Sequence, residues 1–265
     1  MEFVHRITKG GRFNQIYIPK EAEHDFEAGD LVQVKLLQKR AGVYYSSKKI
    51  KLTPFKEKLA RDVFSLLLQN PSVKMVFFVG SFLTSHSEYR DIDIAVIGAD
   101  SQHEIQAAIP KQLSDAFGLR FHILFFTEEQ LPNLLRVCPL TRGMFSLFAS
   151  SMPFSLPTET LRDEKHIEFL IMMPEDLLSV AASPRAFYDA LRRVIAIEHF
   201  LLGRPLDGAS IGKETGKLMG DQVATFLADN ESLPELHIAA VRKVIREKIA
   251  SIRTILGHGK TKNNR

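Results

Sequence analysis

The spacing of apolar residues divides the chain into segments of different character. Alternating apolar and polar positions predict short strands at 13–18 and 31–37. From residue 55 the apolar positions follow a helical spacing, and Pro54 stands where a helix is expected to begin. Strand-like and helix-like segments then alternate as far as about residue 155. In this part, strands are expected at 73–79, 91–97, 119–126 and 144–150, and helices at 55–70, 104–117 and 128–137.

Beyond Pro157 the strand signals stop and helical patterns dominate. Long amphipathic helices are expected at 185–202 and 234–256. The segment between them carries turn residues, and a further helix is expected at 217–227. The pattern as a whole predicts an α+β protein whose last part is a helical bundle.

Composition and charge narrow the class of protein. The chain has 265 residues, 45% hydrophobic and 25% charged, which is ordinary globular composition with length for two or three small domains. A single cysteine, Cys138, excludes an intramolecular disulfide and fits a reducing compartment. No apolar stretch has the length of a membrane span, and the first residues carry charge, so we expect a cytoplasmic protein with no membrane contact. Residues 1–58 carry twelve Lys and Arg against seven acids, a basic bias that suggests contact with phosphates.

The stretch VGSFLTSHSEYRDIDIAVIG, residues 79–98, carries the candidate chemistry. Asp91 and Asp93 lie two apart in an apolar strand, so their side chains are expected on one face, where two buried carboxylates would repel each other. A Mg²⁺ ion, completed by water and substrate phosphates, would remove that cost. Gly80 lets the backbone approach a phosphate, and Ser81 offers a hydroxyl and an N–H. The alternative is an ordinary edge strand with two solvated aspartates.

These motifs resemble the signature of the nucleotidyltransferase superfamily, which includes DNA polymerase beta, kanamycin nucleotidyltransferase and the minimal nucleotidyltransferases. The resemblance covers residues 54–155 and implies an α/β domain with a mixed sheet. It implies that Gly80 and Ser81 bind the triphosphate of an NTP, with ATP the expected nucleotide. Asp91 and Asp93 would be catalytic and hold Mg²⁺.

One position departs from the family pattern. Active members carry a third carboxylate on the next strand, at about the place of His122. A histidine there cannot supply an anionic oxygen, although it could ligate a softer metal, act as a base or sit in the core. The sequence therefore leaves two possibilities open, a domain that transfers nucleotides and an inactive domain that senses them.

Residues 1–53 resemble the AbrB/MazE/SpoVT swapped-hairpin family. The matching features in residues 7–37 are a basic strand with a Gly-Gly turn, Ile-Pro-Lys, a short acidic segment, and Gly-Asp before an apolar strand. The resemblance implies a homodimer that forms one small β-barrel and contacts DNA through Arg6, Lys9 and Arg12. The alternative is a solubilising or dimerising β-appendage.

The helical part, residues 156–265, offers a weaker motif. Arg253 and His258 match the Arg-x4-His spacing of HEPN domains, which implies an RNase or a nucleotide-binding role. The alternative is a helical domain that covers the active-site cleft and shapes the acceptor pocket. Six basic residues of this part could serve either purpose or form a solvated face: Arg192, Arg193, Arg242, Lys243, Arg246 and Lys248.

Two hypotheses of different classes result. In the first, the chain is a dimeric, Mg²⁺-dependent nucleotidyltransferase that transfers NMP to an unknown acceptor and binds DNA through its N-terminal module. In the second, it is a DNA-binding transcriptional regulator with an inactive, nucleotide-sensing domain. Membership of a toxin–antitoxin pair is a third interpretation, which rests on the association of both families with such systems.

Overall fold

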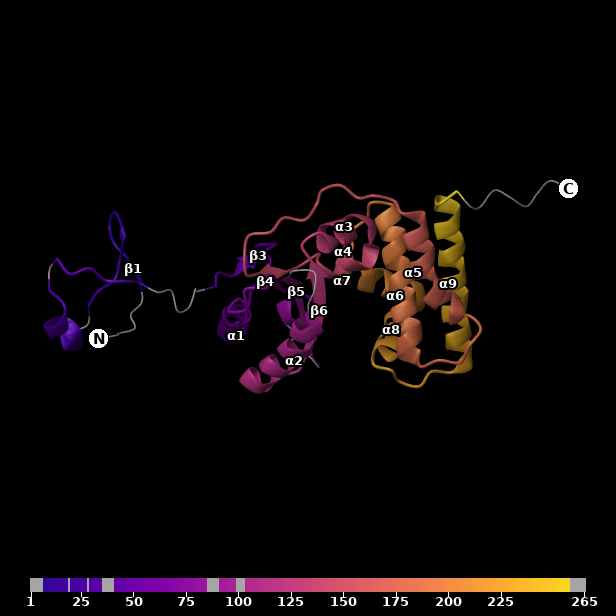
Figure 1. Ribbon diagram of the computed structural model, residues 1–265. Coiled ribbons are helices and arrows are strands. Elements are labelled where there is room, and N and C mark those ends of the chain that lie inside the picture. Colours follow the sequence, from indigo (N-terminus) through magenta and orange to yellow (C-terminus); the bar gives the residue numbers. More distant parts are fainter. Residues whose placement is uncertain are drawn as a thin grey trace. The chain divides into compact units, whose positions relative to one another are not determined.

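The computed structural model describes residues 7–18, 20–27, 29–34, 41–84, 91–98 and 103–257. The chain divides into two compact units, Met1–Lys39 and Arg40–Arg265. Figure 1 labels most of their helices and strands.

The N-terminal unit contains a small hairpin. Strands β1 (Thr8–Lys9) and β2 (Asn14–Gln15) pair antiparallel, and the Gly10 amide donates to the Phe13 carbonyl at 2.9 Å to close the turn. A 3-10 helix, η1 (Lys20–Asp25), follows. The strand predicted at 13–18 is therefore wrong in length.

The strand expected at 31–37 also differs from the structure, whereas the barrel expected of two copies stays a prediction. Residues 31–34, the described part of the strand expected at 31–37, are not in a strand, and the described residues of the unit close no barrel. The physical reason lies in burial: none of these described residues is buried, so one copy of this segment has no core to hold long strands together.

The second unit is built on a mixed sheet, as predicted. The sheet has five strands, one of which comes from the region that the sequence assigned to the N-terminal module. β4 and β5 pair antiparallel, and β5 and β6 pair parallel, with Asp93 opposite His122. The parallel pair is joined by a helical crossover, the connection that parallel strands require. The strands, in sheet order, are β3 (Tyr44–Tyr45), β7 (Ala149–Ser150), β4 (Val73–Phe78), β5 (Ile92–Gly98) and β6 (Phe121–Thr127).

Helices cover both faces of this sheet. On one face, Phe64 of α1 and Leu113 of α2 share a core with β4 and β5. On the other face, Leu135 of α3 packs in a second core with Phe77 of β4, whose ring meets that of Phe145 edge to face. The first three helices confirm the predicted segments, and α4 is an addition. Their bounds are α1 (Pro54–Leu67), α2 (His103–Phe117), α3 (Gln130–Val137) and α4 (Pro139–Met144). The strand expected at 144–150 is wrong in length, because Met144 belongs to α4 and only Ala149–Ser150 pairs in the sheet.

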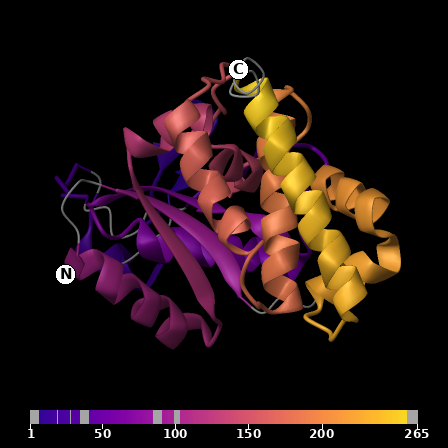
Figure 2. The ribbon, with the colours of Figure 1, turned by 90° about the vertical axis from the view of Figure 1, so that its right-hand side faces the viewer.

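The C-terminal part is helical, as predicted, and α9 lies against α6 (Figure 2, where α9 is yellow). α7 occupies part of the segment expected to form turns, because Asp207 caps its start by accepting from the Ser210 amide. α5 was not predicted. No helix in the described residues is long and apolar enough to cross a membrane. The helices are α5 (Glu164–Asp176), α6 (Pro184–Leu201), α7 (Gly208–Met219), α8 (Asp221–Ala228) and α9 (Glu235–Ile255).

Candidate functional site

The turn after β4 lies against the side chain of Asp93. Gly80 opens the short 3-10 helix η2 (Gly80–Leu83) with φ of +71°, a conformation that favours glycine. A Cβ atom at Gly80 would lie 2.5 Å from Asp93 Oδ2, and the Val79 amide donates to the Asp93 carbonyl at 3.1 Å. Twelve residues separate Gly80 from Asp93 in the sequence, yet the antiparallel pairing of β4 and β5 brings them into contact.

His122 contacts the other oxygen of the same carboxylate. Its Nδ1 lies 3.0 Å from Asp93 Oδ1, because the two residues are register partners in the parallel pair β5–β6. The side chain of His122 is 59% exposed and that of Asp93 is 31% exposed. His122 is therefore not a core residue, one of the three roles that the sequence left open for it.

Asp91 and Ser81 lie near this contact in the chain. Asp91 directly precedes β5 and is exposed, and the Ser81 carbonyl accepts from both the amide and the hydroxyl of Thr84. The prediction that both aspartates are buried is wrong. Because β5 begins only at Ile92, Asp91 lies at the end of the sheet, and Asp93 keeps part of its surface in water.

The donor set at this place suits a hard cation only in part. Among the described residues, no group of three or more His, Cys, Asp or Glu side chains is arranged to hold a metal ion. Mg²⁺ is commonly held by one or two carboxylates, with water and substrate phosphates in the remaining positions. Asp91 and Asp93 supply the two carboxylates, and the carboxylate of Asp93 is partly exposed and therefore accessible to an ion. The third carboxylate of the resembled family has no counterpart at His122.

Lys56 is a residue of this region that the sequence analysis missed. Its charge contributes to the basic bias of residues 1–58, yet the residue is only 6% exposed. Its Nζ donates to the carbonyls of Phe82 and Thr84 at 2.9 and 3.0 Å, directly after the Gly80-Ser81 step. A lysine in the first turn of an amphipathic helix normally faces water, so no sequence signal identified it.

The helical part uses several predicted basic residues internally. Arg253 of α9 contacts Glu175 and Glu168 of α5 at 2.9 and 3.2 Å, and hydrogen bonds to these carboxylates raise the pKa of its guanidinium. His258, the other half of the Arg-x4-His motif, lies outside the described residues. Arg242 donates to the Val180 carbonyl at 2.9 Å. These two arginines thus connect helices and loops within the bundle, a role distinct from a solvated face.

A group of charged side chains lies between α6, α7 and α9. Lys248 donates to Glu198 and to Glu214, and Glu214 also lies 2.7 Å from Nε2 of His199. Burial raises the pKa of the Glu214 carboxyl, but the hydrogen bonds from Lys248 and His199 outweigh it and bring the pKa to about 2. Burial lowers the pKa of the Lys248 ammonium, and its two glutamate partners reverse this to a net increase.

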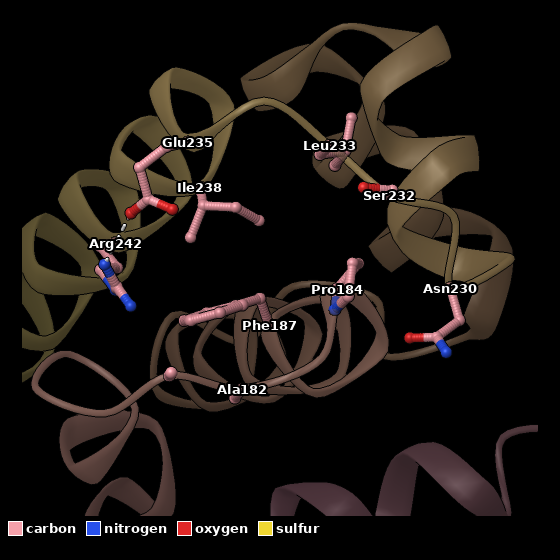
Figure 3. A pocket seen from close by; sticks show the side chains of 10 residues that line it. Ala182, Pro184, Phe187, Asn230, Ser232, Leu233, Glu235, Ile238 and Arg242 are labelled. Carbon is pink, nitrogen blue, oxygen red and sulfur yellow. Dashed lines mark hydrogen bonds and ion pairs between the residues drawn. The ribbon is translucent and has the colours of Figure 1, made fainter.

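A cavity of about 360 Å³ opens elsewhere in the helical part (Figure 3). Phe187 of α6 and Ile238 of α9 form apolar walls, and Arg242 lies over the Phe187 ring at 5.2 Å. Arg242 is also paired with Glu235 at 3.2 Å. The cavity is lined by residues 181–242 alone and includes no predicted site residue except Arg242.

The N-terminal unit presents both cations and apolar side chains to solvent. Lys9 and Arg12 of the hairpin are exposed, whereas Arg6 lies outside the described residues. Eight large apolar residues of this unit are also exposed: Ile7, Phe13, Ile16, Tyr17, Ile18, Leu31, Val32 and Val34.

No protein-family model and no curated protein matches this chain.

Proposed function

We propose that residues 54–155 form a nucleotidyltransferase domain that transfers NMP from an NTP to an acceptor hydroxyl. The observation that carries the proposal is the contact of Gly80 with Asp93, where a Cβ would lie 2.5 Å from the carboxylate oxygen. A turn that places open backbone beside a carboxylate at the end of a strand can hold a phosphate next to a cation.

The roles follow from position. Gly80 and Ser81 bind the triphosphate, with ATP as the expected donor, and Asp91 and Asp93 hold Mg²⁺. The ion, when bound, offsets charge on the reacting phosphate. His122 orients the Asp93 carboxylate through its Nδ1. The acceptor oxygen bonds to the α-phosphorus, the bond from that phosphorus to the bridging oxygen breaks, pyrophosphate leaves, and the hydroxyl proton passes to solvent.

Transfer of label from α-³²P-ATP in the presence of Mg²⁺, to the protein itself or to added RNA ends and small-molecule hydroxyls, tests this proposal. Asp93→Asn is expected to lower the rate at least about 100-fold, because it removes the charge that holds the ion. Asp115→Asn, which changes an exposed carboxylate on α2, is the matched control and is expected to leave the rate unchanged. Equal labelling by wild type and Asp93→Asn would contradict the proposal.

A second function is favoured by one specific observation. His122 occupies the position opposite Asp93 where the resembled family has a carboxylate, and it contacts Asp93 directly. In this alternative the domain binds Mg·NTP without turnover and reports it to the N-terminal module of a transcriptional regulator. Binding of Mg·ATP by wild type with no labelled product from any acceptor would favour it over the enzyme.

We further infer that the N-terminal unit, Met1–Lys39, forms the dimeric swapped-hairpin module that the sequence places at 1–53, and that this module binds DNA. The module ends before residue 53, because Tyr44–Tyr45 pairs with β7 in the sheet of the second unit. In support, the described residues of this unit bury no side chain while several large apolar ones are exposed, and a second copy would cover them. Lys9 and Arg12 stand on the exposed hairpin, where they can reach phosphates.

The DNA proposal predicts a change in salt dependence. Lys9→Gln with Arg12→Gln is expected to weaken duplex binding and to reduce the slope of log K against log salt by about one per lost phosphate contact. Lys48→Gln with Lys49→Gln removes two exposed cations of the second unit and serves as the control. The measurement is fluorescence anisotropy of labelled duplex at several salt concentrations. An unchanged slope in the hairpin variant would contradict the assignment.

A further inference from the structure

Lys56 is a cation on the first turn of α1 whose ammonium faces the backbone of the turn that follows β4. The residue is 6% exposed, and its Nζ donates to the Phe82 carbonyl at 2.9 Å and to the Thr84 carbonyl at 3.0 Å. It also lies 5.3 Å from the centre of the Phe82 ring. Burial lowers the pKa of the ammonium, because it disfavours the charged form. Hydrogen-bond acceptors such as these two carbonyls stabilise the buried charge.

The same turn is anchored at a second point by apolar packing. The Phe82 ring stacks on Phe78 of β4 at 4.6 Å, and Phe78 in turn meets Phe64 of α1 at 5.4 Å. This packing fixes where the turn lies through contacts between side chains. The two hydrogen bonds from Lys56 act on the peptide groups themselves, because they hold the carbonyls of Phe82 and Thr84 toward α1.

The carbonyls held by Lys56 belong to the segment that begins with Gly80 and Ser81. Thr84 closes this segment by donating its amide to the Ser81 carbonyl at 3.0 Å, and the Val79 amide fixes the other end on the Asp93 carbonyl. A phosphate held by backbone needs N–H groups in fixed directions, and small displacements at such sites carry large costs.

We propose that Lys56 is a positioning residue for nucleotide binding. Its hydrogen bonds from α1 fix the peptide groups of residues 80–84, so that Gly80 and Ser81 present a preformed phosphate site beside Asp93. The inference rests on the proposed nucleotide-binding function. It assigns to Lys56 no contact with the nucleotide. The charge and the direction of its hydrogen bonds, rather than the volume of its side chain, are what the turn requires.

Titration of the full-length protein with Mg·ATP tests this role in two variants of α1. Lys56→Met keeps the side-chain volume and removes the charge, and it is expected to weaken binding at least tenfold. Val63→Ala opens a cavity in the core beneath the same helix and leaves the Lys56 ammonium in place. It is expected to weaken binding less than twofold, measured at a temperature equally far below its own Tm. Lys56→Arg, which keeps a cationic donor, is expected to remain within threefold of wild type.

Equal binding by Lys56→Met and wild type overturns the proposal, as does an equal loss in Val63→Ala or in Lys56→Arg. If Lys56→Met does not fold, Lys56→Gln takes its place with the same expected loss.

Amide hydrogen exchange separates this proposal from the function on which it rests. The Thr84 amide is expected to exchange at least tenfold faster in Lys56→Met than in Val63→Ala, because only the first variant releases the turn. If wild type does not bind Mg·ATP, the proposed function fails, and the exchange rates then decide whether Lys56 fixes the turn. Equal exchange at Thr84 in the two variants would remove Lys56 from that role.

Discussion

Replacing Gly80 with alanine is expected to lower the free energy of unfolding by about 2–4 kcal/mol and to reduce nucleotide transfer at least about 100-fold. Two effects combine in the loss of stability. An L-residue is strained at φ of +71°, and the added Cβ would meet Asp93 Oδ2 at 2.5 Å. Activity falls because the Asp93 carboxylate must leave its place. Urea denaturation and the labelling assay measure the two effects.

Gly118 supplies the control for this prediction. Its φ is +63° and a Cβ there would meet nothing within 4 Å, so Gly118→Ala imposes the backbone strain without the collision. It is expected to cost about 1 kcal/mol and to leave nucleotide transfer unchanged. Equal effects of the two substitutions on activity would show that the contact between Gly80 and Asp93 has no functional role.

Lys248→Met is expected to cause the largest loss of stability, about 3–5 kcal/mol, or roughly a 10 °C decrease in Tm. The substitution leaves Glu198 and Glu214 facing each other in the bundle without the cation that bridges them. Lys243→Met on the same helix removes an exposed pair with Glu247 and is expected to cost less than about 1 kcal/mol. Thermal unfolding followed by circular dichroism measures both, and similar Tm values for the two variants would contradict the prediction.

The difference between wild type and Lys248→Met should also depend on pH. The folded-state pKa of Glu214 is lowered from 4.5 to about 2, so its contribution is complete above pH 4.5 and is lost as the pH falls toward 2. The raised pKa of Lys248 means that its own contribution persists through neutral pH and is lost only in strong alkali. The stability gap between the variants is therefore expected to be widest between about pH 5 and 10 and to close in acid.

The strongly periodic elements of the second unit could be predicted from the sequence, and the reasons are physical. After Pro54 the apolar residues follow the spacing of a helix with one buried face. The apolar runs at 73–79 and 91–97 have the length and composition of buried strands, so each segment indicates a single type of secondary structure. α7 was not predicted, because the segment is rich in residues typical of turns. Two of these residues mark the ends of the helix, Asp207 at its start and Gly220 at its end. The N-terminal strands were overestimated because alternation alone cannot supply a core for a short unit.

At the candidate site, the sequence indicated Gly80 and Asp93 but not what surrounds them. Their contact depends on strand pairing, which the order of elements implies. The prediction of buried aspartates failed because apolar neighbours do not reveal where a strand begins, and β5 begins after Asp91. Lys56 was not predictable, because the carbonyls that it binds lie 26 and 28 residues away in the chain.

In the second unit, the core beside the sheet and the core of the helical bundle are connected through α3. Cys138 at the start of α4 is buried in the same apolar cluster as α6 and α9, and Leu134 of α3 packs against that cluster. α3 also covers one face of the sheet through Leu135. One short helix thus contributes to two cores, and disruption of either core removes support from the other. Arg40–Arg265 should therefore melt as one cooperative body, and a fragment cut between sheet and bundle would leave α3 half solvated.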